Sequence, residues 1–300
     1  LRVMFVECGA RVRGSKSSPV VIELGGGELR LKLPSGTVRA RLKPSEVRAL
    51  REIAERADKV TAQLVCRHRP VVWVVGVREA RVELGEPLLV VAADLNSRYG
   101  LVVRGFLVSS GGVGLVVRLR FKPPSHGRRW THVRELMRAG RYREANMVMR
   151  RMSGINRSWE KSVVGGLRRI IGRWVSRGYS AAVLLDLPRA ESLRGTGLNG
   201  TLLGLARRIE WMCGWEGALY VEWRSSGKKC PVCGCRGVEA GRRAYMCPEC
   251  GAEWGRDAAS CFNAVTSFLE HYLRRGDLAE VVRGWLRERA ERSGGSLRKL

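Results

Sequence analysis

Two short cysteine motifs constrain the fold of this chain more than any other feature. Residues 230–234 read C-P-V-C-G, residues 247–251 read C-P-E-C-G, and thirteen residues separate Cys233 from Cys247. Together the motifs supply four thiolates, which is the ligand number of a tetrahedral structural zinc. The glycine after each second cysteine allows the tight turn that brings backbone amides toward the sulfurs. We therefore predict a zinc ribbon with Cys230, Cys233, Cys247 and Cys250 as ligands, and a metal that is structural rather than catalytic.

The remaining cysteines favour a reducing environment. Six of the nine cysteines fall between Cys213 and Cys250, whereas a secreted disulfide framework would spread them along the chain. A redox-active dithiol pair is the alternative interpretation of the motifs. We interpret Cys235 as a bystander that could compete for the metal, and we expect ordinary buried thiols at positions 8, 66, 213 and 261.

The charge of the chain points to a polyanionic partner. It has 55 Lys and Arg residues against 28 Asp and Glu, a net charge of +27, and 45% hydrophobic residues, which excludes wholesale disorder. Nucleic acid is the usual partner of so basic a protein. The alternative is a solvated, arginine-rich surface.

The positive charge is concentrated in residues 118–177, which hold 17 Lys and Arg residues and three Glu. The phosphate-binding candidates taken from this region are Arg128, Arg129, Arg157, Lys161, Arg168 and Arg169. We read most of the nine tryptophans as core residues because of their helical spacing. Trp130 and Trp223 are the two that we allow as base-stacking candidates.

Residues 1–86 read as a small β-rich domain. Short apolar or alternating runs separated by Gly, Pro and Ser predict strands, and Pro44 to Asp58 reads as a helix with Ser45 as its N-cap. The expected strands are 20–24, 29–33, 38–42, 60–66 and 71–77.

After residue 86 the pattern becomes that of an α/β domain. Three strands (88–94, 101–107 and 113–121) precede a helix around 159–174, followed by strand 182–185, a helix over 198–212 and strand 218–221. The cysteine motifs come next, and then a helix through 262–272 and a basic helix to residue 300. This is the element order of the RNase H-like fold. We predict such a domain in two parts, 87–224 and 255–300, interrupted by the ribbon at 225–254.

Three aspartates mark the ends of these elements. Asp94 and Asp186 each end an apolar strand, and Asp257 begins the helix that follows the ribbon. Carboxylates are costly beside buried segments unless they are paired or bound to metal. Three of them together would recruit hard cations such as Mg²⁺ or Mn²⁺. The alternative for each is an ordinary helix cap or strand-end turn, and acids suit helix starts.

The combination resembles the TnpB (OrfB) family of transposon-encoded proteins, relatives of the type V CRISPR effectors. The resemblance rests on A-A-D-L-N at 92–96, an acid ending a later strand, a ribbon introduced by S-S-G-K-K at 225–229, and Arg256-Asp257 before a helix. It extends from 88 to about 268, and more weakly over 19–86, which is similar to the family's barrel-like wedge domain.

The resemblance implies a RuvC-like, metal-dependent nuclease that an RNA guide directs to DNA. It implies Asp94, Asp186 and Asp257 as catalytic, magnesium-binding acids, and it supports the four cysteines as zinc ligands. Two features depart from the family pattern: Asp186 stands where Glu is usual, and little chain precedes the wedge-like region. The alternative is thus a nuclease-inactive, nucleic-acid-binding derivative. With no secretory pattern and no apolar run of about 18 residues, we expect a cytoplasmic protein without a membrane partner.

Overall fold

The computed structural model describes residues 2–8, 19–25, 28–33, 36–56, 59–66, 70–77, 82–96, 100–188 and 199–298. The chain divides into two compact units, residues 1–81 and 82–300, which are described separately below. Within the described residues, every helix is too short or too polar to span a membrane.

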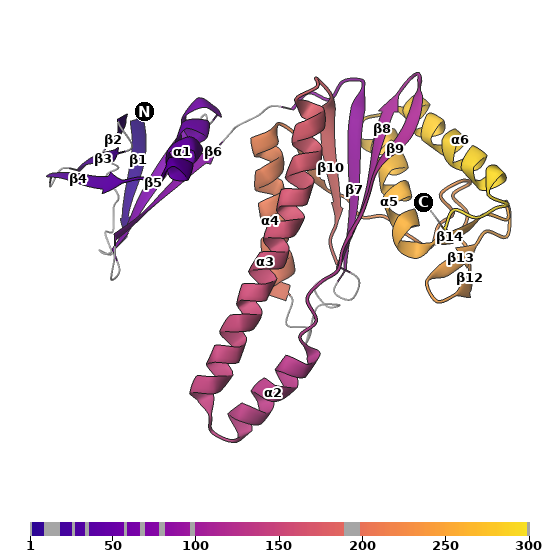
Figure 1. The fold of residues 1–300 in the computed structure, drawn as a ribbon. Coiled ribbons are helices and arrows are strands. Elements are labelled where there is room, and N and C mark those ends of the chain that lie inside the picture. The colour runs from indigo at the N-terminus through magenta and orange to yellow at the C-terminus, as the bar shows by residue number, and fades with distance from the viewer. Residues whose placement is uncertain are drawn as a thin grey trace. The chain divides into compact units, whose positions relative to one another are not determined.

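The first unit is a six-stranded sheet in the order β4-β3-β2-β1-β5-β6, with one helix (Figure 1). Its elements are β1 (Arg2–Cys8), β2 (Pro19–Gly25), β3 (Glu28–Leu33), β4 (Gly36–Arg41), α1 (Pro44–Arg56), β5 (Lys59–Cys66) and β6 (Pro70–Val77). The predicted elements are confirmed, and β1 is an additional strand. In the described residues β4 and β6 are the outer strands, so the barrel remains a prediction.

Helix α1 begins one residue earlier than its predicted cap. The Glu46 carboxylate accepts a hydrogen bond from the Lys43 backbone N–H at 2.7 Å, and the Lys43 carbonyl accepts from the amides of Glu46 and Val47. Lys43 therefore occupies the capping position, and Pro44 takes the first helical position, which needs no N–H.

The second unit is built on a five-stranded mixed sheet in the order β11-β10-β7-β8-β9. Strands β7 (Leu88–Asn96), β8 (Gly100–Ser109) and β9 (Gly112–Phe121) are antiparallel neighbours. Strand β10 (Ser180–Asp186) pairs in parallel with β7, and β11 (Leu219–Glu222) pairs in parallel with β10. The predicted strands and helices of this region occur in the predicted order, with one additional helix after β9.

Both faces of this sheet are covered. Leu88, Val90 and Ala92 face a core formed with the ribbon and the C-terminal helices. Their neighbours Leu89 and Val91 face the core formed with α3 (Tyr142–Val175) and α4 (Asn199–Glu216) on the other side (Figure 1). Burial on both faces explains why these strands read as continuous apolar runs rather than alternating ones.

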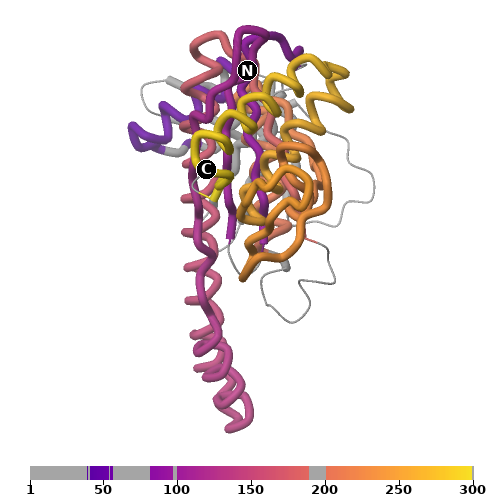
Figure 2. Tube along the Cα trace, turned by 90° about the vertical axis from the view of Figure 1, so that its right-hand side faces the viewer, coloured from indigo at the N-terminus to yellow at the C-terminus, as the bar shows by residue number. Residues whose placement is uncertain are grey.

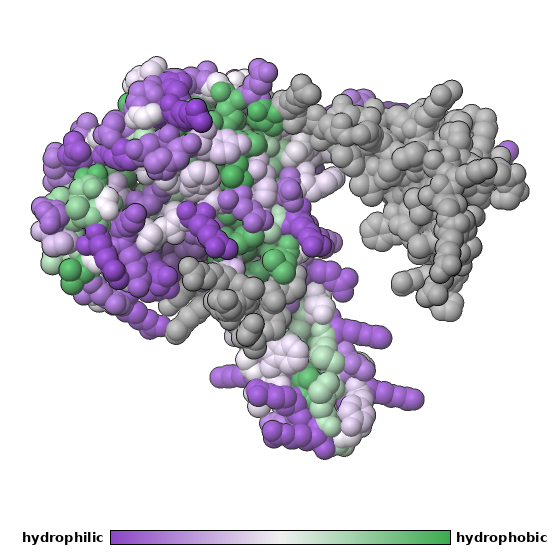
Figure 3. Space-filling view, turned by 180° about the vertical axis from the view of Figure 1, so that it is seen from behind, coloured by the Kyte–Doolittle hydropathy of each residue, from purple (hydrophilic) through white to green (hydrophobic). Residues whose placement is uncertain are grey.

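A helical arm extends from this unit. It consists of α2 (Gly127–Arg138) and the 34-residue α3, which turn back on each other far from the sheet (Figure 2). Its tip is held by a small core of Val133, Leu136, Ala145 and Met152. Hydrophobic side chains run along the arm between projecting hydrophilic ones (Figure 3). The sequence predicted only the part of α3 that packs on the sheet, and it missed α2.

The C-terminal segment connects the last helix to the ribbon. Helix α5 (Arg256–Ser267) continues into the π-helical turn η2 (Phe268–Tyr272), and α6 (Gly276–Arg292) follows. The chain then pairs with Glu253 of the ribbon, whose amide donates to the Gly295 carbonyl and whose carbonyl accepts from the Leu297 amide, both at 2.7 Å. The expected helix to residue 300 therefore ends at Arg292.

Candidate functional site

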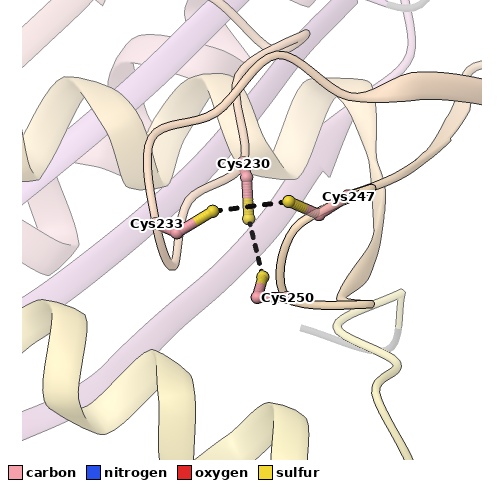
Figure 4. Close-up of side chains that lie close together, drawn as sticks. All are labelled: Cys230, Cys233, Cys247 and Cys250. Carbon is pink, nitrogen blue, oxygen red and sulfur yellow. Dashed lines mark hydrogen bonds between the residues drawn. The ribbon is translucent and has the colours of Figure 1, made fainter.

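The four predicted zinc ligands come together. Their sulfur atoms all lie within 4.8 Å of one another, with 3.6 Å between Cys230 and Cys250 and 3.3 Å between Cys233 and Cys247 (Figure 4). A tetrahedral zinc with bonds of about 2.3 Å places its sulfurs about 3.8 Å apart. The cluster therefore fits a structural zinc, and Cys235 lies outside it.

The two glycines behave as the sequence predicted. Gly234 and Gly251 have φ values of +81° and +69°, and their amides donate to the carbonyls of Cys230 and Cys247 at 2.9 and 3.0 Å. The Cys235 amide can then donate to the Cys233 sulfur. Each cysteine motif therefore forms a tight hydrogen-bonded turn, as a zinc knuckle does.

The ribbon is fixed against the start of α5, next to the third aspartate. Its strands are β12 (Val238–Gly241), β13 (Ala244–Met246) and β14 (Glu253–Gly255). The fully buried Trp254 donates from Nε1 to the Gly227 carbonyl at 3.0 Å. A Cβ on Gly227 would lie 2.1 Å from the Arg256 carbonyl oxygen, so only glycine allows this close approach. This contact positions the start of α5, and with it Asp257.

The three aspartates converge on one edge of the sheet. Asp94 and Asp186 are direct partners in the parallel pairing of β7 and β10, and Asp257 lies in the first turn of α5. Next to them is a pocket of about 330 Å³. The polar residues that line it are Asp94, Asn96, Asp186, Ser225, Arg243, Arg256 and Ser260.

Two serines orient Asp186. Its Oδ2 accepts hydrogen bonds from the Ser225 amide at 3.3 Å and from the Ser260 hydroxyl at 3.4 Å. The Ser225 hydroxyl in turn donates to the Ser260 carbonyl at 2.6 Å. Because Ser225 begins the ribbon segment and Ser260 lies on α5, this network joins both segments to the end of β10.

Arg243 is a site residue that the sequence analysis missed. It lies in the turn between β12 and β13 with φ +62°, and its side chain forms an ion pair with Asp257. The Arg256 amide donates to its carbonyl at 2.9 Å, which holds the turn against α5. In the sequence Arg243 stands out only by its charge. In so basic a chain, one arginine in a loop cannot be distinguished from the others.

The aspartates affect one another electrostatically. Burial, followed by the charges of Asp257 and Asp186, raises the pKa of Asp94 to about 7, although Arg243 and Arg256 oppose the shift. Burial also raises the pKa of Asp186, against the hydrogen bonds from Ser225 and Ser260. Crowded carboxylates of this kind suit a hard divalent cation. In the described part of the chain, however, only the four cysteines have their ligand atoms close enough together to hold a metal ion.

The raised pKa of Asp94 predicts a pH-dependent stability. The unfolded carboxyl titrates near 3.8 and the folded one near 7, so between these values only the folded state keeps the proton. The free energy of unfolding should therefore fall as pH rises through this window, by up to about 4 kcal/mol. We expect Asp94→Asn, which cannot ionise, to remove this fall. Thermal unfolding of the wild type and of Asp94→Asn, from pH 5.5 to 8 without added Mg²⁺, measures this difference. If the stability of the two proteins changes with pH in parallel, the prediction is refuted.

The basic candidates all lie on the arm. Arg128 and Arg129 are in the first turn of α2, and Arg157, Lys161 and Arg169 are exposed on α3. Arg168, also on α3, donates from Nε to the buried carboxylate of Glu216 at 2.7 Å.

Neither tryptophan expected to stack on bases lies open on the surface. Trp130 packs against the small core of the arm. Trp223 packs edge-on against Phe268 and Tyr272 and donates from Nε1 to the Ser267 hydroxyl at 2.8 Å.

Comparison with known proteins places part of this site in a described family. Residues 204–264, from α4 through the ribbon to Asp257 and α5, match the family model "Cas12f1-like, TNB domain". A solved structure, the cryo-EM structure of a Cas12f1-sgRNA-target DNA complex, is similar with 9% identity and a TM-score of 0.46. That match covers 84% of this chain and 62% of the other, so this chain spans less than two thirds of that protein. No curated protein matches. Residues 204–264, which hold the four cysteines and Asp257, are therefore similar to the TNB domain of Cas12f1-like proteins.

Proposed function

We propose that this protein is a metal-dependent, RNA-guided DNA endonuclease of a mobile element. The observation that carries the proposal is the in-register pairing of Asp94 and Asp186 beside Asp257. A helix cap or a strand-end turn explains each acid singly, but it gives no reason for three of them to share one edge. In this proposal residues 87–224 and 255–300 form a RuvC-like domain, 225–254 the zinc ribbon and 1–86 a wedge domain.

The residues at this edge of the sheet would have different roles in the reaction. Asp94, Asp186 and Asp257 would hold Mg²⁺ or Mn²⁺, which, when bound, activates a water and stabilises the leaving oxygen of a phosphodiester. Ser225 and Ser260 keep the Asp186 carboxylate in one orientation. Arg243 pairs with Asp257, and Arg256 lines the pocket where a phosphate would enter.

The arm supplies the nucleic-acid surface of the proposal. A guide RNA would read the target by base pairing, so the protein needs contacts only to the backbone and shape of the duplex. The exposed side chains of Arg128, Arg129, Arg157, Lys161 and Arg169 suit that task. Arg168 is already paired with Glu216, so we expect it to contribute less.

The test is guided cleavage by the purified full chain. RNA that copurifies with the protein is sequenced, and matching DNA is incubated with the complex in Mg²⁺. We expect cleavage of the matching DNA and none of a duplex with a scrambled target. A complex that carries RNA and leaves matching DNA intact would rule out the endonuclease.

A second candidate is a nuclease-inactive binding protein. The ion pair between Arg243 and Asp257 favours it, because it occupies one of the three carboxylates. Asp186 is also one methylene shorter than the glutamate of related proteins, which changes the reach to a cation. For such a protein we expect tight binding of RNA and DNA that is unchanged by adding Mg²⁺ or by Asp94→Ala.

A further inference from the structure

Trp211 on α4 is unusual among the tryptophans whose side chains are described. It is 53% exposed, whereas every other one is buried or half-buried. The sequence analysis assigned it to the core because of its helical spacing. An indole in water forgoes a large gain from burial, and tryptophan is enriched where one side of its ring meets a partner.

The Trp211 ring is held ready for a partner. Trp215, one turn further along α4 and only 5% exposed, stacks against it with ring centroids 5.7 Å apart and planes 16° from parallel. Because Trp215 covers one face, the exposed part of Trp211 consists of the opposite face and the ring edges. A flat partner stacking there would find the ring already fixed, so little side-chain freedom is lost on binding.

The surroundings of the ring are basic. Arg207 and Arg208, four and three residues earlier, lie on the same face of α4 and are exposed. Arg208 forms an ion pair with Glu160 of α3 at 3.3 Å, which brings it to the border with the basic helix of the arm. Glu210 is also exposed, but it projects about 100° around the helix from Trp211.

The surface also leaves room for a ligand on the N-terminal side of the ring. A Cβ placed on Gly204, two turns before Trp211 on the same face, would have no neighbour within 4 Å. Open space, a fixed aromatic face and two arginines are therefore combined on one side of α4.

We infer that Trp211 is a stacking platform for an unpaired base of a single-stranded nucleic acid, with Arg207 on a flanking phosphate. Arg208 is paired with Glu160, so we expect it to contribute less. The inference rests on the proposed nucleic-acid binding and adds a site to it. Every base has a flat aromatic face, so such a platform tolerates any sequence. An apolar protein surface would fit Trp211 alone, but the positive charge around it complements phosphate instead.

The test is binding of labelled single-stranded DNA to the full chain, measured by fluorescence anisotropy. Loss of one stacked base predicts an affinity about 5- to 150-fold weaker for Trp211→Ala. Trp211→Phe should restore most of the loss, whereas Trp211→Leu, which is apolar but not flat, should not. Leu203→Ala is the matched control, since Leu203 is a 50% exposed apolar residue of the same helix that should not matter.

Salt dependence separates stacking from charge. The slope of log Kd against log salt counts released counterions, so it should be unchanged in Trp211→Ala and shallower in Arg207→Gln. If the wild type does not bind nucleic acid, the proposed function and this inference both fail. If it binds but Trp211→Ala has the wild-type affinity, or Leu serves as well as Trp, only the stacking platform is refuted. Unchanged zinc content in every variant shows that the ribbon remains folded.

Discussion

Replacing Asp94 by alanine is expected to reduce Mg²⁺-dependent cleavage of matching DNA by roughly a thousandfold or more. Asp94 is the most central of the three acids, because both other carboxylates act on it and raise its pKa. Without it a cation would lose a ligand between Asp186 and Asp257, and a bound metal ion is worth several kcal/mol to such a reaction. Single-turnover cleavage rates of the two proteins with the same copurified RNA measure the effect.

The chain offers a matched control for this substitution. Asp277 lies in the first turn of α6, as Asp257 does in α5, but its carboxylate pairs with Arg275 on the surface. The Asp277→Ala variant should therefore cleave at the wild-type rate. The Asp94→Ala variant should keep its zinc and its affinity for DNA. Cleavage by Asp94→Ala at the wild-type rate would place the chemistry elsewhere in the protein.

The parts of the fold that the sequence predicted are those in which local pattern and burial agree. Strands β7 and β10 are buried on both faces, and their apolar runs stop at Asp94 and Asp186, where the pairing of the two strands ends. Strand β7 itself continues beside β8 to Asn96. The knuckles were equally predictable, because a tetrahedral ligand set requires a fixed number of cysteines at short spacing.

The arm was harder to predict because the sheet does not define its pattern. The N-terminal half of α3 forms its small core with α2, and side chains such as Met147 and Ile155 are exposed there, so the apolar stripe is narrow. Trp211 misled for a different reason: it was expected in the core like most of the tryptophans, yet it shares its face of α4 with the exposed Arg207 and Arg208. Periodicity gives the rotation of a residue around its helix, but it does not tell which neighbours will cover it.

Arg243 could not be found from sequence because its role depends on a contact between distant elements. The β12–β13 turn reaches Asp257 only because the Trp254 and Gly227 contacts fix the ribbon against α5. Each of these contacts is specific to the folded chain. The local sequence around Arg243 is that of any basic hairpin turn.

Replacing Cys233 by serine is expected to remove the zinc and unfold the ribbon. Its sulfur lies 3.3 Å from that of Cys247 and is one of the four thiolates of the cluster. Zinc binding to such a site is largely the folding energy of the segment, on the order of 10 kcal/mol, so the three remaining ligands should not hold the loop closed. Elemental analysis should find well below one zinc per chain, and hydrogen exchange should show loss of protection over residues 225–256.

The consequences of Cys233→Ser should also reach the aspartates, although four thiolates leave the zinc no open position for chemistry. Asp257 follows Cys250 by seven residues, and Arg243 reaches it only from a folded ribbon. Cleavage should therefore fall together with the zinc content, unlike in Asp94→Ala, where cleavage falls alone. Cys235→Ser is the control, because this cysteine adjoins the cluster without belonging to it and should leave zinc and cleavage unchanged. If Cys233→Ser retains a full equivalent of zinc while Cys235→Ser loses it, the fourth ligand is Cys235.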